Sequence, residues 1–236
     1  MIFMFDVDGT LTPSRGRMDK DFSLWFSSFC HDHDVYVVTG SDRPKTEEQL
    51  GKDIYSKLKG AYQCSGNDHW IGDKRIRTSK FEDLPGDELW KALNVELSVS
   101  KFYIRTGCHI EIRPGLLNFS IVGRNANDQQ RKDYVEYDEI HNERNIIAEH
   151  LRNRFTDYNF QVAGETGIDI VKKGGGKEQV LTDFDKDAII HFYGDKTFPG
   201  GNDHEIAMEV RARGNDAVQV DDWRHTWKLL KEKCKQ

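Results

Sequence analysis

The chain has 236 residues and a formal net charge of −6 at pH 7. This length is enough to bury one large core or two modest ones. The mild acidic charge argues against a nucleic-acid-binding protein, which needs a basic surface, and we expect no membrane span. We also expect reduced thiols in a cytoplasmic protein, because four scattered cysteines form no C-x-x-C pair: Cys30, Cys64, Cys108 and Cys234.

The first part of the chain predicts a parallel α/β sheet. Residues 2–7 are typical of a short buried strand, and residues 35–38 predict a second one. A helix is expected over 19–31, and another begins near Pro44, because proline suits the first turn of a helix. The helix over 19–31 rests on apolar side chains at three- and four-residue spacing: Phe22, Trp25, Phe26 and Phe29. Alternating strands and helices favour a parallel sheet with covering helices.

The middle of the chain has a different pattern. Residues 67–83 are polar and rich in turn formers, which makes them a candidate domain boundary. From Cys108 to Arg113 apolar and polar residues alternate as in a strand, and residues 117–122 predict a returning strand after the turn at Pro114–Gly115. These patterns predict antiparallel strands.

A long amphipathic helix is expected to follow these strands, and residues 160–171 predict further strand. The helix rests on one apolar stripe: Tyr134, Tyr137, Ile147, Leu151 and Phe155. Strands with helices on one face describe an α+β domain.

After three consecutive glycines the first pattern returns, with strands expected over 188–193 and 217–220 and a closing helix over 222–233. The predicted fold class is therefore α/β, a Rossmannoid parallel-sheet core with an inserted α+β cap domain. The predicted domains are residues 1–77 for the first part of the core, 78–175 for the cap and 176–236 for the second part of the core.

Two acidic residues mark the end of the first predicted strand. Asp6 and Asp8 are two positions apart, so in extended backbone both carboxylates face the same way. Asp6 is a candidate nucleophile that forms an aspartyl-phosphate, with Asp8 as the acid/base. Carboxylates beside a phosphate favour Mg²⁺ as the counter-ion. By itself the pattern also fits an acidic turn after a strand.

Further polar residues follow the other predicted strands of the core. Thr39 and Ser41 offer hydroxyls for phosphate oxygens, and Lys177 offers a point charge. Asp195 and Asp203 add two more acids. Each residue alone also fits a structural role, such as a cap, a surface lysine or a turn. Together they supply a nucleophile, a proton shuttle, a hydroxyl, a lysine and metal-binding acids at successive strand ends.

This ordered set resembles the four motifs of the haloacid dehalogenase superfamily. The resemblance implies that Asp6 and Asp8 are the nucleophile and the acid/base. It also implies that Thr39 or Ser41 is the phosphate-binding hydroxyl, with both alternatives open, and that Lys177 is the motif lysine. The implied metal ligands are Asp6, Asp8, Asp195 and Asp203.

A finer resemblance, to the eukaryotic-type phosphomannomutases, covers nearly the whole chain. It rests on segments such as Asp6-Val7-Asp8-Gly9-Thr10-Leu11-Thr12, Ile110-Glu111-Ile112-Arg113 and Pro199-Gly200-Gly201-Asn202-Asp203. The resemblance implies that substrate and phosphate are bound by several further residues: Arg15, Lys45, Arg113, Arg124, Arg131 and Asp169. This chain departs from the family at Gly167, where the family usually carries serine, which implies the loss of one hydroxyl contact.

The resemblance implies a mutase that interconverts mannose 6-phosphate and mannose 1-phosphate with Mg²⁺ and a hexose 1,6-bisphosphate activator. Arginines in the cap suit this reaction, because the sugar needs an anion site at the end away from Asp6. A sugar-phosphate phosphatase on the same scaffold is the alternative hypothesis. The expected partners are a sugar phosphate and a second copy of the chain, in a homodimer through the cap, with neither nucleic acid nor membrane.

Overall fold

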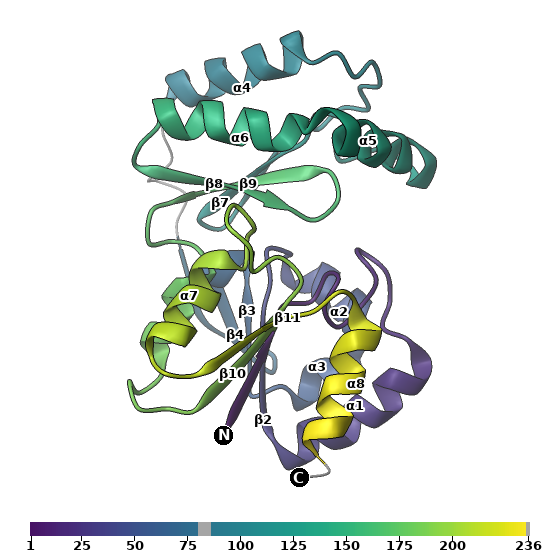
Figure 1. Ribbon diagram of the computed structural model, residues 1–236, viewed down its shortest axis with the longest axis vertical. Helices are drawn as coiled ribbons and strands as arrows, with labels where there is room; N and C mark the ends of the chain where they lie inside the picture. Colours follow the sequence, from purple (N-terminus) through teal and green to yellow (C-terminus); the bar gives the residue numbers. More distant parts are fainter. Residues whose placement is uncertain (80–85, 235–236) are drawn as a thin grey trace. The chain divides into compact units, whose positions relative to one another are not determined.

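The computed structural model describes residues 1–79 and 86–234, and the chain forms two compact units (Figure 1). Unit 1 consists of Met1–Ser79, Gly175–Pro199 and Asp203–Gln236, and unit 2 of Lys80–Gly174 and Gly200–Asn202. The expected domain boundaries after residues 77 and 175 stay a prediction.

Unit 1 is built on a seven-stranded sheet in the order β11-β10-β1-β2-β3-β4-β5. The strands from β11 to β3 are parallel, whereas β4 and β5 are antiparallel. The carboxyl ends of the parallel strands therefore meet at one edge of the sheet. The strand bounds are β1 Ile2–Phe5, β2 Asp34–Val38, β3 Gly60–Gln63, β4 Asp68–Ile71, β5 Lys74–Thr78, β10 Ile190–Gly194 and β11 Asp216–Gln219.

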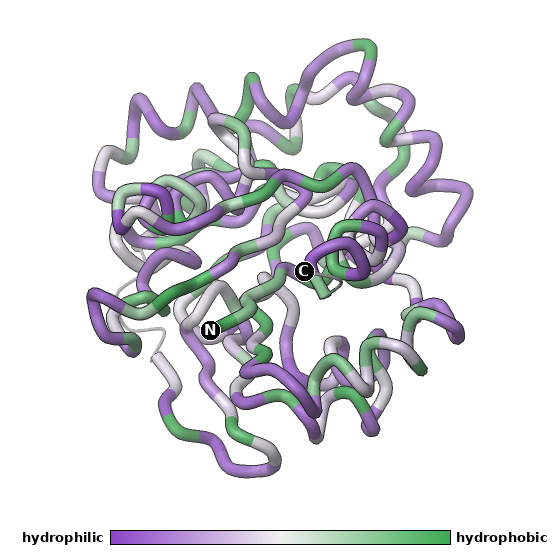
Figure 2. Tube along the Cα trace, turned by 60° about the horizontal axis from the view of Figure 1, so that its bottom comes forward, coloured by the Kyte–Doolittle hydropathy of each residue, from purple (hydrophilic) through white to green (hydrophobic). Residues whose placement is uncertain are grey.

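Helices cover both faces of this sheet (Figure 1). Along β1 the side chains alternate, so Phe3 and Phe5 pack with α1 on one face while Met4 joins the cluster of α7 on the other. In Figure 2 the chain is hydrophobic from its N-terminus along β1, whereas hydrophobic and hydrophilic residues alternate along the helices. The helices are α1 Lys20–Asp32, α2 Arg43–Leu50, α3 Lys52–Lys57, α7 His204–Ala212 and α8 Trp223–Lys233, with 3₁₀ helices at Cys64–Gly66 and Lys177–Asp183.

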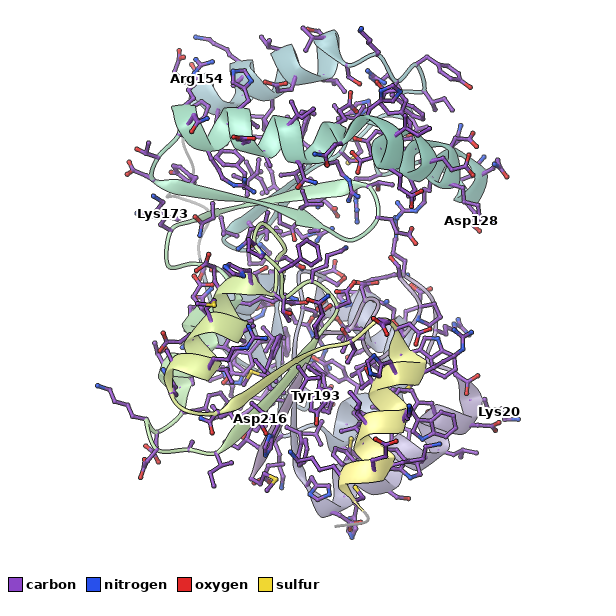
Figure 3. All side chains as sticks on the ribbon, in the orientation of Figure 1. Lys20, Asp128, Arg154, Lys173, Tyr193 and Asp216 are labelled. Atoms are coloured by element: carbon purple, nitrogen blue, oxygen red, sulfur yellow. The ribbon has the colours of Figure 1, made fainter. Side chains whose placement is uncertain are left out.

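The side chains show the same division between inside and outside. Tyr193, in β10, is 3% exposed and lies among the packed side chains of unit 1, whereas Lys20 at the start of α1 points away from them (Figure 3). Buried aromatic and aliphatic groups are the main source of stability in such a sheet.

Unit 2 is an antiparallel four-stranded sheet in the order β6-β7-β9-β8 (β6 Ile110–Arg113, β7 Leu116–Phe119, β8 Tyr158–Ala163, β9 Gly167–Lys172). The helices α4 (Asp87–Val99), α5 (Asp128–His141) and α6 (Glu143–Arg154) lie on one face of it (Figure 1). Strand residues Phe119, Phe160 and Ile170 pack there against Tyr134 and Leu151. The observed unit is α+β.

The division between the two units falls between Ser79 and Lys80, inside the stretch 67–83 expected to hold a domain boundary, although β4 and β5 first extend the sheet of unit 1. Residues 80–83 lie outside the described residues. Two local expectations were wrong. The expected single helix is two, α5 and α6, because Asn142 adopts a left-handed conformation with φ 52° between them. The strand expected over 117–122 ends at Phe119.

None of the helices in residues 1–79 and 86–234 has the length and hydrophobicity that spanning a bilayer requires.

Replacing Phe22 by alanine tests the aromatic core of unit 1. Phe22 is fully buried and its ring lies 5.4 Å from those of Phe26 and Trp227. We expect the free energy of unfolding to fall by about 3–5 kcal/mol, because the cavity removes these contacts. Leu24→Ala, on the same helix but 67% exposed, is the control and should change it by less than about 0.5 kcal/mol. Equal shifts of both urea unfolding curves would contradict this packing.

Candidate functional site

Successive strands of unit 1 end in polar side chains at one edge of the sheet. Asp6 follows β1 directly, and its N–H still bonds to the carbonyl of Tyr193 at 2.9 Å. Thr39 follows β2, Asp195 follows β10, and Asp203 is the residue before α7. Since parallel strands end at the same edge, residues far apart in sequence are brought together here.

The buried ammonium group of Lys177 joins two of these acids. Its Nζ lies 2.6 Å from Oδ1 of Asp6 and 2.6 Å from Oδ1 of Asp203. Lys177 and Asp203 are fully buried and Asp6 is 3% exposed, so water does not screen these contacts. The second oxygen of Asp203 accepts from the backbone N–H of Lys196 at 3.1 Å. The lysine predicted from the sequence thus contacts the predicted nucleophile.

Burial and crowding shift the protonation of this group. Burial raises the pKa of Asp6 well above its ordinary value, and Asp203 and Asp195 raise it further, against the opposing effect of Lys177. Burial alone would lower the pKa of Lys177, but the carboxylates of Asp203 and Asp6 outweigh it and the pKa is raised. Burial, together with Asp203, raises the pKa of Asp195 to about 6. The lysine therefore stays charged, while the carboxylates favour an additional cation.

The same carboxylates fit a divalent cation. Within the described part of the chain, Asp6, Asp195 and Asp203 each offer an oxygen, and these atoms lie within 4.8 Å of one another. Lys177 offsets one of the three negative charges of the carboxylates. Mg²⁺, which prefers oxygen ligands, would balance the two that remain. Gly9 permits this arrangement: it has φ +78°, and a Cβ there would lie 2.5 Å from Oδ2 of Asp195.

Asp8 is not part of that group of three, and its carboxylate is held by donors. Oδ1 accepts from the N–H of Arg15 at 2.5 Å and from Nε2 of Gln49 at 2.9 Å, and Oδ2 accepts from the hydroxyl of Ser41 at 3.3 Å. The sequence did not single out Gln49. It is a buried polar residue of α2, and only the fold shows what it contacts. The metal-ligand assignment of Asp8 stays a prediction.

The remaining candidates of unit 1 lie around Asp8. The hydroxyl of Thr39 accepts from the N–H of Ser41 at 3.1 Å, so both predicted hydroxyls belong to one turn. Lys45 donates from Nζ to the carbonyl of Arg15 at 3.0 Å and pairs with Glu48. Arg15 has φ 54°, an uncommon conformation for a residue with a side chain. These contacts build a compact polar loop beside Asp8.

Unit 2 holds the other predicted binding residues, beginning with two arginines on one carboxylate. Oε2 of Glu111 lies 2.6 Å from NH2 of Arg113 and 2.8 Å from Nε of Arg124. The side chains of Arg113 and Arg124 are 11% and 22% exposed. Glu111 thus positions both guanidinium groups, a role that the sequence did not assign to it.

Arg131 and Asp169 are the other two predicted binding residues of unit 2. Arg131 is on α5 and contacts Glu165 at 3.0 Å and the hydroxyl of Thr166 at 3.1 Å. Asp169 is in β9, 2% exposed, and its Oδ1 accepts from Nδ2 of Asn118 at 2.6 Å. Each predicted residue of unit 2 is therefore fixed by a specific neighbour.

Solved structures of similar fold come from phosphate-cleaving enzymes. A Plasmodium falciparum IMP-nucleotidase mutant has a TM-score of 0.61 at 15% identity, over 99% of this chain and 66% of that one. A subclass IIB sugar phosphatase of the haloacid dehalogenase superfamily has a TM-score of 0.60 at 14% identity, over 99% of this chain and 98% of that one. At such identity these structures show the fold alone, which is that of the haloacid dehalogenase superfamily.

The family follows from sequence comparison. The model of the eukaryotic phosphomannomutase family matches residues 26–233. A phosphomannomutase of Saccharomyces cerevisiae is 32% identical over 242 residues, covering 98% of this chain and 93% of that protein. Another, of Glycine max, is 34% identical over 228 residues, covering 94% and 92%. The chain therefore belongs to the eukaryotic phosphomannomutase family.

Replacing Lys177 by methionine tests the buried ion group. We expect the free energy of unfolding to fall by about 3–5 kcal/mol at pH 8, because the carboxylates lose their buried cation. Without Lys177, the pKa of Asp6 in the folded protein rises further above its value in the unfolded chain. The loss of unfolding free energy is therefore greatest at pH values above the pKa of Asp6 in the folded variant. It should shrink as the pH falls toward 5 and the carboxyl becomes protonated.

Thermal unfolding between pH 5 and 8 measures this difference from the wild type. Lys196→Met is the control, because Lys196 is 20% exposed and 3.9 Å from Asp195, and it should cost less than about 1 kcal/mol. A deficit of the Lys177 variant that widens toward low pH would contradict the assigned charges.

Proposed function

We propose that this protein interconverts mannose 6-phosphate and mannose 1-phosphate, with a hexose 1,6-bisphosphate as activator and intermediate. The observation that carries the proposal is the contact of Lys177 with Asp6 at the carboxyl edge of the sheet, in a chain of the phosphomannomutase family. A buried carboxylate beside a fixed ammonium group is suited to attack a phosphoryl group, because the cation draws the anionic substrate to it.

In the first half-reaction, an oxygen of Asp6 forms a bond to the phosphorus of the bisphosphate. The bond between that phosphorus and the sugar oxygen breaks, its electron pair stays on the sugar oxygen, and Asp8 delivers the proton. In the second half-reaction, Asp8 removes a proton from a hydroxyl of the monophosphate, which takes the phosphoryl group from Asp6. The donors on Asp8 orient its carboxylate for both steps.

A cation completes the charge balance of this site. Asp6, Asp195 and Asp203 are the residues that would hold Mg²⁺, and Asp8 is a further candidate ligand. When bound, Mg²⁺ neutralises phosphate oxygens and stabilises the charge that develops during transfer. Thr39 or Ser41 would donate a hydroxyl hydrogen bond to the same phosphoryl group, and Lys45 and Arg15 would add positive charge next to it.

Unit 2 would supply the second anion site that a mutase needs. Arg113 and Arg124 are held together by Glu111, and the planar fork of a guanidinium group matches the geometry of a phosphate. Arg131 would add a third cation, and Asp169 would bind sugar hydroxyls. A phosphatase that only releases phosphate has less need for such a second site, which favours the mutase.

Two further parts of the proposal concern location and assembly. We place the protein in the cytoplasm, which the scattered free cysteines support. We also propose a homodimer through unit 2. Its support is a set of exposed apolar side chains on and next to the helices of that unit: Val95, Val99, Tyr103, Ile140 and Ile146.

The activity is tested with purified protein and mannose 1-phosphate, with and without glucose 1,6-bisphosphate. We expect mannose 6-phosphate to form only with both the activator and Mg²⁺, and formation to stop on adding EDTA. Asp6→Asn should abolish turnover because an amide cannot form the acyl phosphate, whereas Asp21→Asn, at an exposed position of α1, should retain it. Steady release of free phosphate in place of mannose 6-phosphate would identify a phosphatase.

Replacing Arg124 by alanine tests the anion site of unit 2. We expect kcat/KM for mannose 1-phosphate to fall about 10- to 100-fold, because a charged hydrogen bond contributes about 1.5–3 kcal/mol. Mg²⁺ affinity, measured by calorimetry, should not change, since the candidate metal ligands belong to unit 1. Arg154→Ala, at a surface pair with Glu88, is the matched control. Unchanged kinetics of the Arg124 variant would remove it from the site.

A further inference from the structure

One face of the sheet in unit 2 carries a row of polar side chains, one from each strand. Glu111 of β6 pairs with Asn118 of β7, Asn118 pairs with Asp169 of β9, and Asp169 pairs with Gln161 of β8. Residues directly opposite each other in an antiparallel sheet lie on the same face, so the four side chains are neighbours. The register of the sheet therefore places Asn118 and Gln161 on the two sides of Asp169.

The neighbouring positions show that this is the face away from the helices. The flanking rows, which include Phe119 and Ile168 on one side and Leu117 and Ile170 on the other, belong to the hydrophobic cluster under the helices. Side chains alternate along a strand, so the polar row faces the opposite way. These polar side chains therefore lie outside the hydrophobic core of unit 2.

Two amide oxygens of this row are buried without a hydrogen bond. Gln161 and Asn118 are 5% and 4% exposed, and among the described residues nothing donates to Oε1 of Gln161 or Oδ1 of Asn118. A buried acceptor left without a donor costs about 1–3 kcal/mol. Such groups in a folded protein require an explanation, and a ligand that supplies the missing donors is one.

Asn118 is also fixed in place by its neighbours. Its Nδ2 donates to Oδ1 of Asp169 at 2.6 Å, which turns its oxygen away from that carboxylate. A Cβ at position 167 would lie 2.6 Å from the same Nδ2 and displace it. Gly167 thus lets the Asn118 amide lie against β9 and keeps its unpaired oxygen in a defined position.

We propose that Gln161 is a specificity-determining residue whose amide oxygen accepts a hydrogen bond from a ring hydroxyl of the bound sugar phosphate. Asn118 presents a second acceptor on the other side of Asp169. The inference rests on the proposed function and adds to it the residues that select the sugar. The unpaired amide oxygens suit hydroxyl groups, which can donate a hydrogen bond, whereas phosphate oxygens only accept and are bound by the arginines instead.

The physical consequence is discrimination between sugars that differ at one hydroxyl. A site whose buried acceptor depends on a ligand hydroxyl rejects an analogue that lacks it, because the acceptor is then left unpaired. Removing the acceptor from the protein should abolish that discrimination and leave the rest of the binding intact.

The test measures binding by calorimetry with Mg²⁺ in the full-length Asp6→Asn protein, which cannot form the acyl phosphate. The probes are mannose 1-phosphate and its analogues that each lack one of the 2-, 3-, 4- and 6-hydroxyls. We expect Gln161→Met in the Asp6→Asn protein to weaken the binding of mannose 1-phosphate about 5- to 10-fold, which is the equivalent of one hydrogen bond. For one analogue, the affinity should be the same with and without the Gln161 substitution.

Asn159→Leu is the matched control, because Asn159 is on the same strand and face but pairs with Val171. It should change the affinity for all probes by one common factor. Gln161→Leu repeats the test if the methionine variant has a lowered melting temperature. An equal loss for every analogue, no loss at all, or no binding of mannose 1-phosphate by the Asp6→Asn protein would overturn the inference. Failure of the mutase proposal would instead appear as missing turnover in the wild type.

Discussion

The candidate site of unit 1 depends on one buried ammonium group. Lys177 contacts Asp6, which is 171 positions away in sequence, and Asp203, which is 26 positions away. It thus joins the first strand to the segment in which unit 1 resumes after unit 2. A buried ion pair contributes little net stability, because desolvation offsets the attraction. Its effect is geometric: Asp6 can be buried as a carboxylate only where Lys177 reaches it. The separation in sequence makes folding of the whole of unit 1 a condition for assembling the site.

The two units carry opposite kinds of charge at their candidate sites. In unit 1 the carboxylates outnumber the cation that contacts them, whereas in unit 2 two arginines share the single carboxylate of Glu111. In the proposed reaction, the first arrangement would need a metal ion before it accepts a phosphate, and the second would bind a phosphate directly. A sugar with phosphate at alternate ends presents different groups to the two kinds of site. This asymmetry supports transfer between two positions of one sugar more than simple release of phosphate.

The sequence predicted the elements whose periodicity comes from one buried face. The helix around Phe22 and the strand before Asp6 are examples. Asp6 follows a strand as expected, whereas Lys177 begins a 3₁₀ helix and Asp203 precedes α7, so neither lies at a strand end. The sequence did not predict β5, whose residues are all exposed and so show no alternation, nor the helix break at Asn142, which depends on a single residue with positive φ. Gln49 and Gln161 also escaped prediction. Their candidate roles rest on cross-strand and tertiary neighbours, which residue type and spacing do not reveal.

The effect of Gly167 depends on a neighbour that a motif comparison does not reveal. Read along the chain, glycine in place of the family's usual serine implies only a lost hydroxyl contact. In the folded unit the space beside position 167 is occupied by the Asn118 amide, which donates to Asp169. A serine there would displace this amide, so the two positions are coupled and neither can be interpreted alone. Under the role proposed for Gln161, selectivity for a sugar hydroxyl depends on the polar atoms near Asp169 that lack a hydrogen bond within the described part of the chain, and two of these are amide oxygens.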